Sequence, residues 1–381
     1  MSVCNPVLKS IMQIVYENRC SLADKPKIVV RHEVADGRPM CEVWFMTEGC
    51  AYDREGGCTM CNYGKGHNVA VETILTQLAD AILSLPKADY NLVVNPSGSF
   101  LDEREVSNAL RDGIYKLLDN VTFESLTVES RADVLQTDML NVLRVRYPEK
   151  RVSVEIGVET LNPWLLRNSV NKGVTLTQII EAVHIVHEAG LLSIANIGLG
   201  LPFVNERTNI AYASASVVMA IKMGFDSVIL FPYHVKPGTL LETLYSNGSY
   251  QCVSLWALVD ALSTLPKELL PRVNISWYRN YYTDKTKIMA SPDTCPECSE
   301  TILRLLDDYK SNPSEGILVV LNNINCCCRA RWRESLNSQV EGVEFAHVEQ
   351  DYYALAKHFH IEHDLLEGTL REMRETMYVD Y

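Results

Sequence analysis

The sequence lacks any apolar run that could cross a membrane. Its longest apolar stretch extends from Leu191 to Val204 and is interrupted by Asn196 and two glycines, whereas a membrane-spanning helix needs about 20 consecutive apolar residues. The N-terminal segment lacks the basic n-region and the A-x-A-like cleavage site of a secretory signal. We therefore expect a cytoplasmic protein that has no membrane partner.

Basic residues are scarce relative to acidic ones. Lys and Arg number 35 against 48 Asp and Glu, so the formal net charge is −13. An acidic surface repels the phosphate backbone of nucleic acids unless a local basic groove exists, so the composition disfavours nucleic acid as a partner. The charged fraction of 22% beside a hydrophobic fraction of 47% excludes collagen-like, low-complexity and mostly disordered proteins.

Two common nucleotide-binding motifs are also absent. The chain has no Walker sequence. GLGLPF at residues 198–203 lacks the G-x-G-x-x-G spacing and the helix start of a dinucleotide fingerprint. The chemistry must therefore be sought in other residue types.

Short strand-like runs alternate with helical patterns along most of the chain, which is typical of βα units around a parallel sheet. We expect strands at residues 41–46, 91–95, 125–128, 152–156, 193–199, 227–231 and 273–277. Apolar residues at helical spacing predict an N-terminal helix near 7–15 and further helices near 71–83 and 176–186. Strand starts recur every 27 to 50 residues, which favours a partial (β/α)6-type TIM barrel over an open sheet.

The pattern changes after about residue 285. A cysteine-containing segment is followed by a predicted helix around residues 299–310, a strand-like GILVVLN at 316–322 and a tail rich in charged and aromatic residues. We therefore divide the chain into a barrel with an N-terminal helix, residues 1–285, and a small cysteine-rich C-terminal α+β domain that binds metal, residues 286–381.

Twelve cysteines in a long cytosolic chain indicate metal binding or catalysis rather than disulfides. Four of them are scattered and are expected to be small buried apolar side chains: Cys4, Cys20, Cys41 and Cys252. The other eight fall into two clusters.

The first cluster lies on a glycine-rich loop directly after the first predicted barrel strand. It contains Cys50, Cys58 and Cys61. Three thiolates on one loop suit a metal centre, and no nearby residue is obviously spaced as a fourth zinc ligand, although His67 stays open. Three cysteines on a cubane [4Fe-4S] cluster would leave one iron open to substrate. The glycines would let the backbone wrap closely around such a cluster.

This loop resembles that of the radical SAM superfamily, in which three cysteines after the first strand of a partial barrel hold a [4Fe-4S] cluster that chelates S-adenosylmethionine (SAM). The usual spacing is C-x3-C-x2-C, whereas this chain has C-x7-C-x2-C. The resemblance therefore rests on the C-x2-C end, the position of the loop and the segments that follow. It implies that Met60 lies near the adenine of SAM. A zinc or purely architectural loop is the alternative.

Later segments that follow predicted strands strengthen the resemblance, because a barrel builds its site at these strand ends. In NPSGSFLD, Ser97, Gly98 and Ser99 resemble the small loop that meets the SAM amino group. In TVESRAD, Glu129 and Arg131 resemble the pair that contacts the ribose and carboxylate of SAM. Three further residues of the implied cofactor-binding set are Glu155, Glu159 and Asn196.

Within the superfamily, residues 30–280 look most like the radical SAM subunit of archaeosine synthase and its Elp3-like relatives. The resemblance is carried by GCTMCNYG, GSFLD, VESR, EIGVET, NKG and PGTLLETLYSNGSY followed by LW. It implies a tRNA substrate, which the acidity of the chain makes unexpected.

The second cluster comprises Cys295 and Cys298 in TCPECSE and three consecutive cysteines in NINCCCRARW. A CxxC followed by a second pair is a strong metal signal. Alternate side chains of an extended chain face opposite sides, so Cys326 and Cys328 are the predicted second pair and Cys327 is spare. These four cysteines suit either a zinc ion or an auxiliary [4Fe-4S] cluster.

We therefore predict a radical SAM enzyme. A low-potential donor such as flavodoxin or ferredoxin would supply the electron that cleaves SAM, and the resulting 5′-deoxyadenosyl radical would abstract hydrogen from a small biosynthetic substrate. Sulfur insertion from an auxiliary cluster is a further option. Tyr233 and His234, which end the sixth predicted strand, are the predicted substrate-facing catalytic residues. The alternatives are a tRNA base-modifying enzyme and a non-catalytic metal-binding scaffold.

Overall fold

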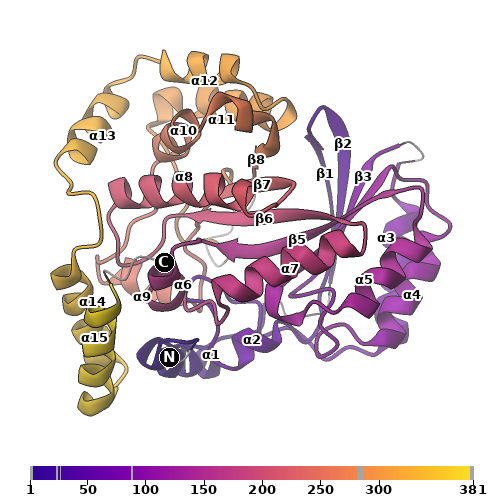
Figure 1. The fold of residues 1–381 in the computed structure, drawn as a ribbon, viewed down its shortest axis with the longest axis horizontal. Helices are drawn as coiled ribbons and strands as arrows, with labels where there is room; N and C mark the ends of the chain where they lie inside the picture. The colour runs from indigo at the N-terminus through magenta and orange to yellow at the C-terminus, as the bar shows by residue number, and fades with distance from the viewer. Residues whose placement is uncertain (1–2, 23–24, 26, 87–88, 281–286, 378–381) are drawn as a thin grey trace.

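A curved sheet of eight strands forms the centre of the molecule (Figure 1). The computed structural model describes residues 3–22, 25, 27–86, 89–280 and 287–377, and all structural statements concern these residues. The strands lie in chain order: β1 (Ile28–Ala35), β2 (Arg38–Phe45), β3 (Asn91–Pro96), β4 (Ser125–Ser130), β5 (Arg151–Glu159), β6 (Leu192–Leu199), β7 (Ser227–Pro232) and β8 (Val273–Ile275).

The sheet is an open, partial barrel. β1 pairs with β2 in antiparallel fashion, and each later strand pairs in parallel with the one before it. No pairing joins β1 to β8 within the described residues. The predicted partial TIM barrel is therefore confirmed, with all seven expected strands present and β1 added at the edge.

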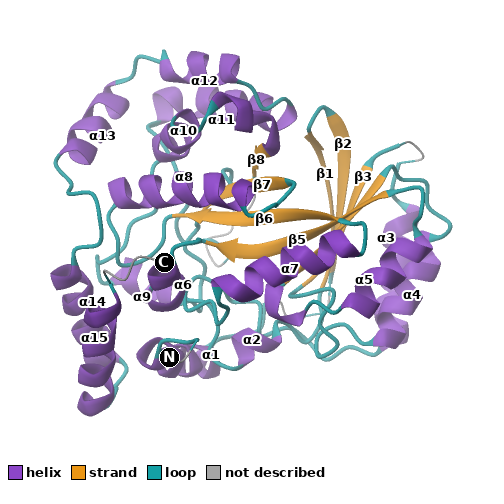
Figure 2. Cartoon of the chain, in the orientation of Figure 1, coloured by secondary structure: helices purple, strands orange, loops and turns teal. Residues whose placement is uncertain are grey.

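Helices cover the outer side of the sheet between successive strands (Figure 2). They are α3 (Val71–Leu83), α4 (Asn108–Leu118), α5 (Thr137–Arg146), α7 (Leu176–Glu188), α8 (Glu206–Lys222) and α10 (Leu255–Ser263). α1 (Pro6–Asn18) precedes the sheet, whereas α2 (Ala51–Arg54), α6 (Pro163–Asn168) and α9 (Leu240–Ser246) follow β2, β5 and β7, and two 3₁₀ turns lie at Ala132–Val134 and Lys267–Arg272.

Side chains alternate between the two faces of each strand, so one face of the sheet packs in the core and the other faces the candidate site. In β5, Val154 and Ile156 are buried in the core shared with the outer helices. Because side chains alternate across a strand, Glu155 lies on the opposite face, inside the barrel. The helices are specified locally as well, since α7 begins with a capping box in which Thr175 and Gln178 satisfy each other's backbone N–H groups.

The segment after β8 is helical throughout its described part. Its helices are α11 (Pro296–Ser311), α12 (Glu315–Asn322), α13 (Cys327–Asn337), α14 (Phe345–His358) and α15 (His363–Thr376). The strand predicted at 316–322 is wrong, because this segment is α12. Leu318 and Leu321 are buried at helical spacing, whereas Val319 and Val320 between them are half exposed, a pattern that a strand could not give.

The core has two parts. The larger lies between the sheet and the outer helices and includes Ile302, Leu306 and Leu318 from α11 and α12. The smaller joins α1, α6, α9, α14 and α15, and it includes Cys58. The predicted division into two domains falls between residues 285 and 286, outside the described residues, and it stays a prediction. Among the described helices, none combines the length and the apolar character that a bilayer span requires.

Candidate functional site

The glycine-rich cysteine loop follows β2 at the carboxyl end of the parallel strands. Cys50 caps α2, and Cys58 and Cys61 lie in the turns that follow. The amide of Cys61 donates to the carbonyl of Cys58 at 3.1 Å, so these two cysteines lie within one turn. Burial raises the pKa of all three thiols, that of Cys61 to about 12. Buried thiols of this kind become ligands only when a metal replaces their protons.

The three loop cysteines are the candidate ligands of the cluster predicted from the sequence. Among the described residues, one group of three or more potential ligand atoms lies within 4.8 Å of one another, and it does not include the loop cysteines. The same finding leaves His67 outside such a group, and its Nε2 lies 3.3 Å from Ser21 Oγ.

Glycines allow the loop to fold back on itself. A Cβ on Gly49 would lie 2.1 Å from the carbonyl oxygen of Tyr63, and one on Gly66 would lie 1.9 Å from that of Thr47. The amide of Cys50 donates to the Tyr63 carbonyl at 3.0 Å. Larger residues at these glycines would push apart the two sides of the loop that carry the cysteines.

A buried ion pair braces the loop from outside. Arg19, directly after α1, pairs with Asp53 of α2, and both side chains are almost fully buried. Arg19 Nη2 also donates to the Cys61 carbonyl at 3.2 Å, and its Nε donates to the Gly238 carbonyl at 2.6 Å. Asp53 accepts a further bond from the Gly64 amide at 2.6 Å. Arg19 therefore joins α1, both ends of the cysteine loop and the segment after β7.

The SGS loop lies directly against Cys50. A Cβ on Gly98 would be 3.2 Å from the Cα of Cys50. The buried carboxylate of Glu105 connects the two loops, because it accepts from the Ser99 amide at 2.5 Å and from the Ala51 amide at 2.7 Å. Burial raises the pKa of Glu105 to about 7, although these two amides oppose the rise. Ser97 accepts from the Thr47 amide at 3.0 Å.

Arg131 and Glu159 both contact Lys172. Arg131 Nη2 donates to the Lys172 carbonyl at 3.0 Å, and its guanidinium lies 4.0 Å from the centre of the Tyr52 ring. Lys172 Nζ donates to Glu159 at 3.0 Å, and the Tyr233 hydroxyl donates to the other oxygen of Glu159 at 2.8 Å. Glu159 has a φ of +68°, so this network holds a strained backbone at the end of β5.

Glu129 and Glu155 occupy paired positions on β4 and β5, on the inner face of the sheet. Asn196 Nδ2 donates to Glu155 at 2.6 Å, and the buried Asn196 Oδ1 has no partner among the described residues. Burial raises the pKa of Glu129 to about 8 and that of Glu155 to about 7. The charged groups that also act on the two carboxyls are Glu42, Glu159, Lys172 and Lys310.

These raised pKa values predict a pH-dependent stability. In the unfolded chain a glutamate titrates near about 4.3, so between that pH and about 8 the folded protein holds more protons on Glu129 and Glu155. Their contribution is fully present below about pH 4 and is lost as the pH rises. We expect the Glu129→Gln variant to flatten the fall in unfolding free energy between pH 5 and 8, by at most about 1.4 kcal/mol per pH unit.

Urea denaturation at several pH values checks this expectation. The control is Glu72→Gln, since Glu72 is exposed on α3. An unchanged slope in the Glu129→Gln variant would contradict the raised pKa of Glu129.

The remaining predicted site residues differ in their surroundings. Met60 is partly buried against the smaller core, next to the cysteines. His234 is buried between Ser291, whose Oγ lies 2.9 Å from Nδ1, and the Trp277 carbonyl, which lies 2.5 Å from Nε2. Burial lowers the pKa of His234 to about 4. Both of its ring nitrogens thus contact the protein itself and tie together the segments that follow β7 and β8.

The four predicted C-terminal ligands come together at the starts of two helices. Cys295 and Cys298 belong to the start of α11, and Cys326 and Cys328 to the start of α13. Their sulfur atoms all lie within 4.8 Å of one another. Cys327 is exposed and does not belong to this group.

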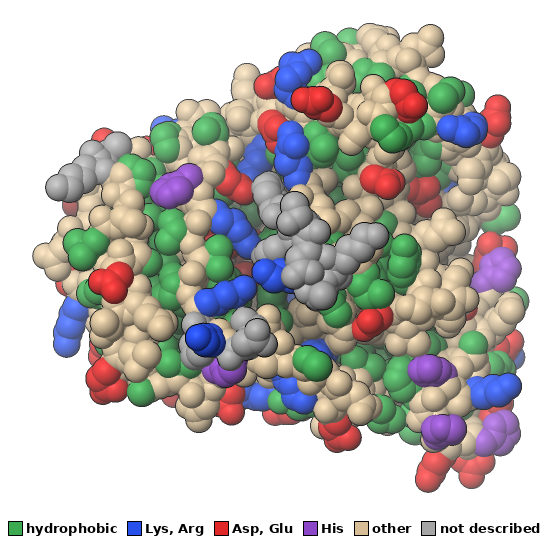
Figure 3. All heavy atoms as spheres, turned by 180° about the vertical axis from the view of Figure 1, so that it is seen from behind, with side chains coloured by type: hydrophobic (Ala, Val, Ile, Leu, Met, Phe, Trp, Pro, Cys, Tyr) green, Lys and Arg blue, Asp and Glu red, His purple; other side chains and the backbone are tan. Residues whose placement is uncertain are grey.

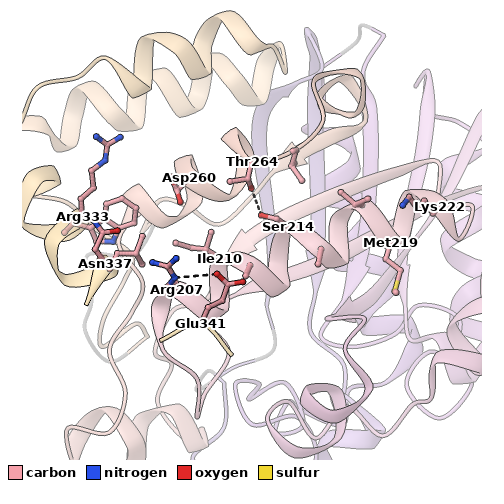
Figure 4. A pocket seen from close by; sticks show the side chains of 16 residues that line it. Arg207, Ile210, Ser214, Met219, Lys222, Asp260, Thr264, Arg333, Asn337 and Glu341 are labelled. Atoms are coloured by element: carbon pink, nitrogen blue, oxygen red, sulfur yellow. Dashed lines mark hydrogen bonds and ion pairs between the residues drawn. The ribbon is translucent and has the colours of Figure 1, made fainter. Parts of the chain in front are cut away.

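A pocket of the described structure lies away from the cysteine loop (Figure 4). It is an open groove of about 890 Å³ between α8, α10 and α13, and Arg207, Asp260, Arg333 and Glu341 line it. It contains none of the predicted cofactor or catalytic residues. Because it lies on the outer side of the sheet, we assign the chemistry to the cysteine loop and the barrel interior instead.

Sequence reasoning missed the residues that hold the site together, namely Arg19, Asp53, Glu105 and Lys172. Each of these residues has a partner that is separated from it by more than 30 positions in the sequence. Asp53 lies within the cysteine loop and Glu105 follows the GSFLD segment, but acidic residues at such places are usually exposed.

Comparisons with known proteins identify the group to which the chain is related. No protein-family model matches it. An uncharacterised protein of Methanocaldococcus jannaschii is 29% identical over 230 residues, which is 58% of this chain and 63% of that protein. The archaeosine synthase subunit beta of Methanosarcina acetivorans is 26% identical over 77% of this chain and 84% of its own length.

The same subunit of Thermococcus kodakarensis is 30% identical over 237 residues, 59% of this chain and 72% of that protein. The chain belongs to the family of the archaeosine synthase beta subunits. Among solved structures, Elp3 of Methanocaldococcus infernus aligns with a TM-score of 0.43 at 16% identity, over 63% of this chain and 58% of that one. Cys50, Cys58 and Cys61 are the residues that would hold the [4Fe-4S] cluster predicted from the sequence.

Proposed function

We propose that this chain is the radical SAM subunit of an enzyme that modifies a base in tRNA. The similarity to two archaeosine synthase beta subunits, one of them over 77% of this chain, carries the proposal. It favours the tRNA reading over a small biosynthetic substrate and over a non-catalytic scaffold. Sulfur insertion and the identity of the electron donor stay predictions.

The proposal gives each group of residues a role. Cys50, Cys58 and Cys61 would hold the cluster. When bound, the cluster supplies the electron that cleaves SAM, and SAM supplies the group that abstracts hydrogen from the substrate. The remaining residues would bind and orient SAM: Met60, Ser97, Gly98, Ser99, Glu129, Arg131, Glu155, Glu159 and Asn196. Tyr233 would act through Glu159, to which its hydroxyl donates.

Basic and aromatic side chains meet at the open end of the barrel. Lys236, after β7, lies 4.7 Å from the ring centre of Tyr63 and 5.6 Å from that of Trp277. Arg31 of β1 lies 5.0 Å from the same Trp277 ring, and Lys27 lies 5.8 Å from the ring of Trp44. Positive charge beside stacking platforms is typical of surfaces that bind unpaired nucleotides.

Figure 3 shows Lys and Arg side chains gathered near the centre of the face opposite to the view of Figure 1. A local basic area of this kind can attract the phosphate backbone of tRNA although the net charge of the chain is −13. The overall acidity still argues that this chain does not grip a whole tRNA by itself. We therefore propose that a second subunit supplies much of the contact to the phosphate backbone.

A binding titration with tRNA at several salt concentrations tests the proposal. We expect the Lys27→Glu variant to bind tRNA several-fold more weakly, with a salt slope smaller by about one unit, because one phosphate contact is lost. The control is Lys222→Glu, since Lys222 is exposed at the end of α8 on the outer side of the sheet. We expect the release of 5′-deoxyadenosine to increase when the tRNA substrate is added. No increase would contradict the proposed tRNA modification.

A further inference from the structure

We propose that Cys295, Cys298, Cys326 and Cys328 bind one zinc ion in a closed tetrahedral site, rather than a second [4Fe-4S] cluster. The sulfur of Cys295 lies 3.5 Å from that of Cys298 and 3.3 Å from that of Cys326, and the sulfurs of Cys298 and Cys328 are 3.5 Å apart. All four lie within 4.8 Å of one another. This inference is independent of the tRNA substrate proposed above.

The sulfur spacing decides between the two metals. Zinc binds thiolate sulfur at about 2.3 Å, so a regular tetrahedron places the four sulfurs about 3.8 Å apart. A cubane carries each cysteine on a different iron, so its four cysteine sulfurs must lie well outside the cube. The observed spacing leaves room for one ion at the centre of the four sulfurs and none for a cube of four irons and four sulfides.

The surroundings of the four sulfurs also suit a closed structural site. Two cysteines come from the first turn of α11 and two from the first turn of α13, where the helix dipoles favour negative charge. The indole N–H of Trp256 in α10 donates to Cys328 Sγ at 3.3 Å, as an outer-shell partner of a ligand does. Four protein ligands leave no position open for substrate, which is typical of structural rather than catalytic zinc.

The ion would fix α13 to the barrel. Trp256 lies in the main core, so its bond to Cys328 connects the metal site to a helix of the barrel. From there α13 forms one wall of the groove in Figure 4, and Trp332 of α13 donates to Glu206 at the start of α8 at 2.9 Å. Loss of the ion should therefore loosen this wall without touching the cysteine loop.

Metal analysis of the full chain, purified without oxygen, tests the proposal. The Cys50→Ala/Cys58→Ala/Cys61→Ala variant leaves the C-terminal cysteines as the one remaining cysteine cluster, and we expect it to contain about one zinc and no iron. Growth with cobalt should give the intense visible absorption of tetrahedral Co²⁺ bound to thiolates. The matched control is Cys327→Ser, which removes the neighbouring thiol and should keep the zinc.

Each outcome bears on the proposal. Loss of zinc in the Cys298→Ser variant, with iron retained at the loop, supports it. If that variant does not fold, the triple variant still decides the question by its metal content. About four irons with iron–sulfur absorption in the triple variant, or no metal at all, would overturn the zinc site.

Discussion

Replacing Cys61 by alanine is expected to remove the iron of the loop and reduce the release of 5′-deoxyadenosine at least about 100-fold. Even an outer-shell partner of a metal ligand typically contributes 10- to 100-fold, so the loss of one of three ligands should cost more. Burial raises the pKa of the Cys61 thiol and so stabilises its protonated form, and a bound metal would have to displace that proton. Iron content and SAM cleavage with dithionite, both measured without oxygen, check this result.

The scattered cysteines provide the control. Cys20 is exposed and lies only one residue after Arg19, so Cys20→Ala tests whether removing a thiol near the loop is enough to cause the effect. We expect this variant to keep its iron. A Cys61→Ala protein that retains its iron and cleaves SAM would contradict the proposed role of the loop. The alternative would then be that the loop is purely architectural.

The sequence predicts the barrel well because the parallel strands are buried on their helix-facing side. Runs such as SIANIGL and SVILF combine β-branched residues with short length, and the intervening amphipathic helices leave few alternative folds. β1 was missed because IVVRHEVA is an edge strand with charged residues on one face. Its signal was the turn that follows it, where Asp36 and Gly37 take φ values of +52° and +71°.

The error at α12 has a different origin. GILVVLN is rich in β-branched residues, so its local preference favours a strand. Tertiary contacts override that preference. Leu318 and Leu321 are both buried in the core, and residues three apart face the same side only in a helix. The two exposed valines, Val319 and Val320, keep the β signal without taking part in any sheet.

The site was predictable only where its chemistry needs a distinctive residue. Cysteines at short spacing predict metal binding from the sequence alone. The Arg19–Asp53 pair and Glu105 could not be found in this way, because arginine and acidic residues are common and usually exposed. Their importance arises from burial, which only the fold creates. Arg19 precedes Asp53 by 34 positions, and no local pattern connects them.

Replacing Arg19 by methionine is therefore expected to lower the free energy of unfolding by about 3–5 kcal/mol, because it leaves the buried carboxylate of Asp53 without its partner. Removing the uncompensated charge as well, in Arg19→Met/Asp53→Asn, should restore part of this loss. Urea denaturation provides the measurement. The matched control is Arg304→Met, which breaks the exposed pair with Asp308 and should change the unfolding free energy by no more than about 0.5 kcal/mol.

The same substitution should also affect the metal centre, because Arg19 donates to the Cys61 carbonyl and to the Gly238 carbonyl. We expect Arg19→Met to bind iron less tightly than the wild type even where the protein is still folded. The double variant separates the two roles of Arg19: it should recover stability but not iron affinity, since the bonds to these carbonyls stay broken. Full recovery of both would show that Arg19 acts only by neutralising Asp53, and full stability in the single variant would contradict the buried ion pair.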